Sequence, residues 1–226
     1  MTYSLAFLVL LSGVPGFSQG FHLGVKAGIP MTQYFETGLT GSLHGGAAYS
    51  AATRRYTIGV TGEWRLTNSF GFEADAMYHR MGYVGIVDYF DSANGNFQNS
   101  AIDIKGDSWD FPLLAKYRFG HAIRPYVAAG GAVRYVGPVR GRGEQTAGSL
   151  AAETSSTVPL DTDAPSELRK RFYPGLTAGA GLEVRVGRFR MLPEFRYTRW
   201  TANISAPGGL LRFASNQAEF LAGVLF

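Results

Sequence analysis

The sequence lacks cysteine altogether, so no disulfide holds its fold, and at 226 residues a core can form without one. Charged residues are scarce, at 17% of the chain. After residue 18 no apolar run approaches the roughly 18–20 residues of a membrane-spanning helix, and the mean hydropathy is close to zero. These absences exclude a helical membrane protein with several spans, while a hydrophobic content of 46% argues against intrinsic disorder.

The chain is instead rich in glycine and in aromatic residues, with 30 Gly, 16 Phe, 12 Tyr and 3 Trp. A helical bundle would not carry that many glycines, because each costs about 1 kcal/mol in a helix interior. The formal net charge of +4 is mild and its basic residues are scattered, so we expect no nucleic-acid partner. The composition therefore favours a β-structure.

The N-terminal 18 residues predict an export signal. They carry no charge, include an apolar run over 5–11, and end with small residues at Gly16 and Ser18. We interpret 1–18 as a signal peptide and 19–226 as one β-barrel domain. The positive charge that usually opens a signal peptide is missing, and the alternative is a buried first strand or a short helix.

Alternation of apolar and polar residues dominates the rest of the chain. In 109–119, for example, Trp109, Phe111 and Leu113 share one parity, and Asp110 and Lys116 share the other. A period of two is typical of a strand with two different faces. We predict eight strands, at about 21–29, 55–66, 70–83, 107–119, 124–137, 172–186, 189–201 and 212–226.

The predicted connections alternate between short turns and long segments. The turns fall at 67–69, 120–123 and 187–188, and the long segments at 30–54, 84–106, 138–171 and 202–211. Short turns at one end and long loops at the other are typical of bacterial outer-membrane barrels. We therefore predict an all-β fold, an eight-stranded antiparallel up-and-down transmembrane β-barrel. An even strand number would leave the N- and C-termini periplasmic.

The polar parity predicts a charged lumen. A barrel in a membrane turns its apolar parity to lipid, and small residues beside charges suit a narrow interior. Opposite charges can pair there, which lowers the cost of their burial. The predicted lumen network comprises Glu63, Arg65, Glu73, Asp75, Lys116, Arg118, Glu183, Arg185, Glu194, Arg196 and Glu219, and the same parity carries Lys26, Asp110 and Arg134. The alternative is a soluble barrel with salt-bridged outer strands.

Aromatic residues of the apolar parity form two predicted belts around an aliphatic band. Trp64, Tyr117 and Phe189 lie towards the short-turn end, and Trp109 and Tyr197 lie towards the other end. Such belts are expected where amphipathic rings meet the two membrane interfaces. Arg80 and Arg199 interrupt this apolar face near the loop end of their strands. We hypothesise that they contact lipopolysaccharide phosphates. The simpler alternative is that their side chains snorkel to the membrane interface.

Three stretches carry a resemblance to a known family. They are 109–119 followed by 124–127, then 193–200, and a final strand that ends on an aromatic residue. The chain resembles the small outer-membrane β-barrel domain family of Gram-negative bacteria, with OmpA-like and opacity-like architecture. The resemblance implies that the barrel-assembly machinery recognises the last strand, through Phe220, Val224 and Phe226.

No catalytic, cofactor-binding or metal site emerges from the sequence. The four histidines have no metal-pair spacing, and His79 is interpreted as an interior side chain. Glu73 and Asp75 share a strand face, but lumen arginines favour ion pairing over acid–base chemistry. We therefore expect no cofactor and no enzymatic activity.

The predicted function is an integral outer-membrane barrel with a structural or surface-interaction role. Long extracellular loops would project above a narrow charge-paired lumen. The alternatives are a narrow pore for small solutes and a lipid A-modifying enzyme. Outer-membrane lipid and lipopolysaccharide are the expected partners, and the partner of the loops stays open.

Overall fold

The computed structural model describes residues 20–36, 38–42, 44–51, 56–120, 123–150, 152, 154–163, 171–201 and 213–226, so the predicted signal peptide lies outside it. Within this part the chain forms β-strands, and no helix there is long and apolar enough to cross a membrane. The strands are β1 (Phe21–Pro30), β2 (Gly38–Ser42), β3 (Gly45–Ala51), β4 (Thr57–Arg65), β5 (Phe70–Asp91), β6 (Asn96–Arg118), β7 (Ile123–Ser149), β8 (Thr154–Asp163), β9 (Phe172–Val186), β10 (Phe189–Trp200) and β11 (Asn216–Leu225).

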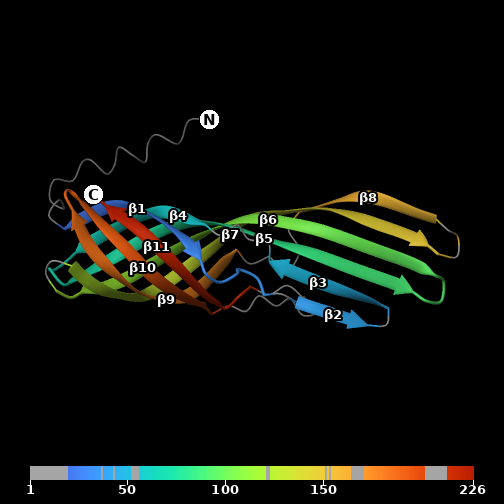
Figure 1. Ribbon diagram of the computed structural model, residues 1–226, viewed down its shortest axis with the longest axis horizontal. Helices are drawn as coiled ribbons and strands as arrows, with labels where there is room; N and C mark the ends of the chain where they lie inside the picture. Colours follow the sequence, from blue (N-terminus) through green and yellow to red (C-terminus); the bar gives the residue numbers. More distant parts are fainter. Residues whose placement is uncertain are drawn as a thin grey trace, which may run out of the picture.

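Eight of these strands close into an antiparallel barrel, as predicted (Figure 1). The order around it is β4, β1, β11, β10, β9, β7, β6 and β5, and β5 pairs with β4 to complete the ring. The first and last strands are neighbours, with Val25 opposite Val224. Closure leaves no unpaired edge within the barrel wall, which is the condition for a sheet to lie in lipid.

Local sequence explains the tight turns at one end. Between β4 and β5 the Thr67 hydroxyl accepts hydrogen bonds from the backbone N–H groups of Ser69 and Phe70, at 3.3 and 2.9 Å. Between β9 and β10 the two-residue turn places Gly187 at φ 62°, a left-handed conformation that favours glycine. The C-terminus lies at this short-turn end (Figure 1).

At the opposite end the structure differs from the sequence prediction. The segments 30–54, 84–106 and 138–171 were expected as loops, but most of their described residues are strands. β5 and β6 stay in register from Phe70 opposite Tyr117 to Asp91 opposite Asn96, beyond the barrel. The β2–β3 hairpin pairs with β5 on one side, and β8 pairs with β7 on the other.

We call this projection of β2, β3, β8 and the far halves of β5, β6 and β7 the extended sheet (Figure 1). Its Gly-, Ser- and Thr-rich composition is typical of loops. Continued ladder pairing nevertheless satisfies the backbone of strands that the barrel has already aligned. The fourth expected loop, 202–211, lies outside the described residues.

The outward face of the barrel is apolar and carries the predicted belts. Ile58, Val60 and Leu113 are each more than half exposed in its middle. Ring pairs flank this band: Phe189 packs edge-on against Phe226 near the short turns, and Tyr78 packs against Trp109 near the extended sheet. Apolar side chains therefore face outward and charged ones inward, the arrangement of a membrane barrel.

Candidate functional site

The barrel interior is a stack of ion pairs, and the level nearest the short turns is built by β4, β6 and β9. Glu63 accepts a hydrogen bond from Arg65 at 2.6 Å and also contacts Arg118. The Arg118 guanidinium donates to Glu183 at 2.8 Å, and Arg65 donates to the same carboxylate at 2.7 Å. Alternation on each strand directs these side chains inward, so opposite charges from three strands meet.

The middle level centres on Lys26 of β1. Its ammonium lies 2.5 Å from Glu73, 3.1 Å from Glu194 and 3.3 Å from Asp75, and all four side chains are fully buried. Arg196 lies 2.8 Å from Asp75 and 2.7 Å from Glu194. Burying charges without partners would be costly, and this mutual pairing offsets much of that cost.

Small residues provide the space that these side chains fill. Gly181 of β9 stands opposite Tyr126 of β7, and a Cβ on Gly181 would lie 2.6 Å from the tyrosine ring. The Tyr126 hydroxyl donates to Glu194 at 3.0 Å, and Lys116 lies over its ring at 4.0 Å. Gly181 thus makes room for a large buried group.

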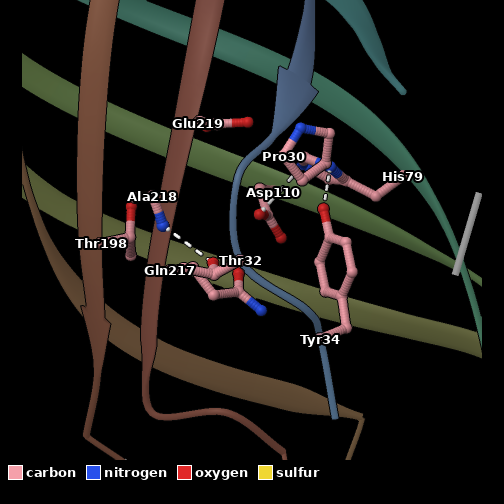
Figure 2. A pocket seen from close by; sticks show the side chains of 9 residues that line it. All are labelled: Pro30, Thr32, Tyr34, His79, Asp110, Thr198, Gln217, Ala218 and Glu219. Atoms are coloured by element: carbon pink, nitrogen blue, oxygen red, sulfur yellow. Dashed lines mark hydrogen bonds and ion pairs between the residues drawn. The ribbon is translucent and has the colours of Figure 1, made fainter. Parts of the chain in front are cut away.

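The third level combines a histidine with a buried ion pair, and Figure 2 draws its residues Tyr34, His79 and Asp110. Arg134 donates two hydrogen bonds to Asp110, each of 2.7 Å. Nε2 of His79 lies 3.1 Å from the same carboxylate, while Nδ1 contacts the hydroxyl of Tyr34. The Thr57 hydroxyl also contacts Nδ1 of His79, at 2.9 Å. His79 is therefore an interior side chain, as predicted, although its Nε2 makes no hydrogen bond among the described residues.

A small polar cavity lies beside this level (Figure 2). Its free volume of about 10 Å³ fits about one water molecule. Its lining includes Pro30, Thr32, Tyr34, His79, Asp110, Thr198, Gln217, Ala218 and Glu219.

An apolar cap covers the interior at the extended-sheet end. The segment 31–36 runs inward after β1, so that Tyr34 and Phe35 are buried. Ala214 donates a backbone hydrogen bond to Tyr34 at 2.8 Å, and the ring of Phe35 packs on that of Phe213. The cap comprises Tyr34, Phe35, Met81, Tyr83, Ile104, Ala132, Val136, Tyr173, Trp200 and Phe213. The lumen is thus filled by charge pairs and covered by packed rings.

Most residues of the predicted lumen network meet inside the barrel, and two differ. Arg185 was expected in the lumen, but its side chain is exposed and has no ion pair among the described residues. It lies one residue from the end of β9, where the lumen opens to solvent. Glu219 accepts a hydrogen bond from the Thr57 hydroxyl at 3.3 Å rather than pairing with a cation in the described part.

The other predicted residues lie on the outward face. Arg80 of β5 is half-buried and Arg199 of β10 is exposed, both near the extended-sheet end of their strands. Phe220 of β11 and Phe226, which follows this strand, are exposed, and Val224 is half-buried on the same parity.

Sequence reasoning missed two tyrosines of the interior. Tyr126 has lumen parity, but the sequence prediction places aromatic residues on the lipid face. The small residue that makes room for its ring, Gly181, is identified only by the register between β7 and β9. Tyr34 falls in a segment expected as a loop. No group of three metal-ligating side chains was found among the described residues.

Comparisons with known proteins agree with this architecture. The sequence profile described as outer membrane protein beta-barrel domain matches residues 17–199. No curated protein matches the chain.

Solved structures similar to this chain include three outer-membrane proteins. Ail of Yersinia pestis, in complex with the heparin analogue sucrose octasulfate, is 12% identical, with 92% of this chain and 99% of that chain covered and a TM-score of 0.38. OprG of Pseudomonas aeruginosa is 16% identical, with 91% and 94% covered and a TM-score of 0.45. The outer membrane protease OmpT of Escherichia coli is 11% identical, with 92% and 94% covered and a TM-score of 0.37.

Proposed function

The chain belongs to the outer membrane protein beta-barrel domain family. Within this family we propose that it has a structural or surface-interaction role and that its lumen does not conduct. The observation that carries this proposal is the filled interior. Buried ion pairs centred on Lys26 occupy the lumen, and the cap around Phe35 lies above them. A water-filled path through such a barrel would require both to be displaced.

Planar-bilayer recording of the purified chain tests the closed state. We expect no stable single-channel events, since the buried ion pairs and the cap occupy the lumen of the described barrel. The narrow pore for small solutes is the second candidate, favoured only by the polar character of the lumen. Reproducible unitary currents from the refolded protein would support the pore and contradict the proposal.

The extended sheet is the proposed interaction surface. Large apolar side chains are exposed on it, among them Leu39 at 84%, Ile86 and Val158. With periplasmic termini, as proposed here, this sheet would stand outside the cell. Such a paired sheet presents strand edges and apolar side chains to a partner.

Single cysteines test this orientation, because the chain has none of its own. Ser156→Cys lies on β8 of the extended sheet, and Arg188→Cys lies in the turn between β9 and β10. A membrane-impermeant maleimide added to intact cells should label the first variant and label the second only after lysis. The reverse pattern would place the sheet in the periplasm.

An enzymatic role has little support in the described geometry. His79 and Asp110 form the best acid–base pair, yet they lie beneath the cap and face the lumen rather than lipid. A lipid substrate could not reach them without displacing Tyr34. Mass spectra of lipid A from cells with and without the protein should be identical; a new lipid A species would support the modifying enzyme.

The membrane itself is the remaining proposed partner. Arg80 and Arg199 lie on the outward face beyond the belt of Tyr78 and Trp109, where contact with lipopolysaccharide phosphates is expected. During assembly, β11 would be recognised through Phe220, Val224 and Phe226 before it pairs with β1 and β10.

A further inference from the structure

A groove lies on the outward face at the junction of the barrel and the extended sheet. Its free volume is about 370 Å³. Three adjacent strands, β5, β6 and β7, supply its lining of Arg80, Lys105, Gly106, Asp107, Pro138 and Arg140. The groove is therefore part of a continuous sheet surface rather than a gap between loops.

A β-bulge forms the groove. The register of β6 with β7 shifts between Gly106, opposite Val139, and Ser108, opposite Val136. Asp107 therefore has no partner on β7, and Gly137 and Pro138 lie between the two pairings. A bulge bends its strand and redirects side chains, and bulges are common beside functional sites.

Two cations of the groove lie at directly opposed positions on neighbouring strands, where they repel each other. Lys105 and Arg140 stand directly opposite each other on β6 and β7. Like charges at opposed positions destabilise a strand pair unless an anion lies between them. Arg80 of β5, which stands opposite Asp107 of β6, brings a third cation to the same face.

The neighbouring carboxylates only partly neutralise these cations. Asp107 accepts a hydrogen bond from the Tyr78 hydroxyl at 2.6 Å, and Asp103 pairs with Lys105 at 2.5 Å. Arg80 and Arg140 have no ion pair in the part of the chain that the structure describes, and the lining itself holds three cations and one carboxylate.

The height of the groove matches a lipid headgroup. Arg80 is two residues beyond Tyr78 along β5, and Lys105 is four residues beyond Trp109 along β6. At a rise of about 3.3 Å per residue in tilted strands, the cations lie roughly 5–11 Å beyond the aromatic belt. Belt rings sit at the interface of the membrane, so the groove meets the charged layer just outside it.

We propose that Arg80, Lys105 and Arg140 form a binding site for a phosphate group of an outer-leaflet glycolipid, an inference that rests on the proposed orientation. Guanidinium groups bind phosphate oxygens bidentately, and the ammonium adds a point charge between them. The lipid chains would then lie along the apolar face of β5 and β6, beside Trp109. The site assigns a specific role to Arg80 and does not involve Arg199.

Titration calorimetry on the full chain in detergent micelles tests this site with three probes: bisphosphorylated lipid A, the same lipid stripped of phosphate, and inorganic phosphate. The variants are Arg80→Gln and Arg140→Gln. Arg188→Gln is the matched control, because it removes the same charge from an exposed turn at the other end. Heat-modifiable migration verifies that each variant is folded. If either groove arginine variant does not fold, Lys105→Gln, at a side chain that is 60% exposed, tests the same site.

Each groove variant should weaken binding of bisphosphorylated lipid A by about fivefold, while Arg188→Gln should leave it unchanged. Lipid A without phosphate should bind the groove variants and the unmodified chain equally. An equal loss for both lipids, or no loss at all, would overturn the site.

Inorganic phosphate that binds as tightly as the lipid would show a free-anion site and overturn the glycolipid assignment. If the unmodified chain binds neither lipid, the proposed lipopolysaccharide contact fails as well. If it binds both lipids without regard to phosphate, this inference and the proposed phosphate contacts of Arg80 and Arg199 fail, while the structural or surface-interaction role stands.

Discussion

Tyr126 of β7 fills the space opposite Gly181 of β9, so that a side-chain atom on the glycine would lie within 2.6 Å of the ring. Gly181→Val should therefore displace Tyr126 from Glu194 and destabilise the barrel by about 1–3 kcal/mol. Urea unfolding in lipid vesicles, followed by tryptophan fluorescence, measures the change. Gly131→Ala is the control, since a Cβ there meets no atom within 4 Å; equal losses for both would contradict the space argument.

The Arg134–Asp110 pair offers a second prediction. Arg134→Met leaves a buried carboxylate without its bidentate partner, and we expect a loss of about 3–5 kcal/mol. The double variant Arg134→Met with Asp110→Asn should recover part of that loss, because no uncompensated charge remains. The same unfolding experiment reports both. A double variant no more stable than Arg134→Met would show that the loss comes from packing against Tyr34 and Trp200 instead.

The contact between Tyr34 and His79 should hold the cap on the charged interior. Tyr34→Phe keeps the ring but removes the hydroxyl, so that Nδ1 of His79 keeps only its contact with the Thr57 hydroxyl, at an expected cost of about 1 kcal/mol. Tyr89→Phe is the control at a side chain that is 55% exposed. Hydrogen exchange of the backbone amide of Ala214, which bonds to the Tyr34 carbonyl, should quicken in Tyr34→Phe alone.

The tip of the extended sheet should respond to acid. Hydrogen bonds from the Asn94 amide and the Ala93 backbone N–H lower the pKa of Asp91 below its ordinary value of 3.8. A lowered folded-state pKa stabilises the turn above that ordinary value, and this contribution is lost as pH falls through the lowered pKa. NMR titration of the Asp91 carboxyl carbon measures it. Asn94→Ala should raise the pKa; an unchanged midpoint would exclude the amide as a cause.

Assembly through the last strand provides the fifth prediction. Phe226→Ala should reduce the folded, heat-modifiable fraction in outer membranes, since it removes the proposed recognition residue at the end of the chain. Phe189→Ala removes the other ring of the same edge-on pair but leaves β11 intact. The folded fraction should fall in the first variant and hold in the second. Equal losses would assign the effect to the aromatic belt rather than to recognition.

The barrel was predictable because its signals are local. Every residue of a strand in a closed wall faces either lipid or lumen, so the parity of Trp109 and Asp110 already separates the two environments. Short turns needed only Thr67 or Gly187 at defined positions. The same rule places Lys26, Glu73 and Arg196 inside the barrel, without reference to the distances between them.

The extended sheet was not predictable in this way. Beyond the barrel the residues of β5 from Ile86 to Phe90 are exposed on both faces. The sequence from Val84 to Lys105 accordingly loses strict alternation and is typical of a loop. Pairing across the ladder, which depends on strands already aligned below, decides its structure.

The sequence by itself determined the eight-stranded wall, its apolar exterior and its charged interior, because a period of two records which face each side chain takes. Only the tertiary structure decided which charges meet, that Tyr34 and Phe35 fold back to cover them, and that a bulge at Asp107 gathers Arg80, Lys105 and Arg140 around one groove. Those contacts join residues far apart in the chain, and they depend on the register between strands.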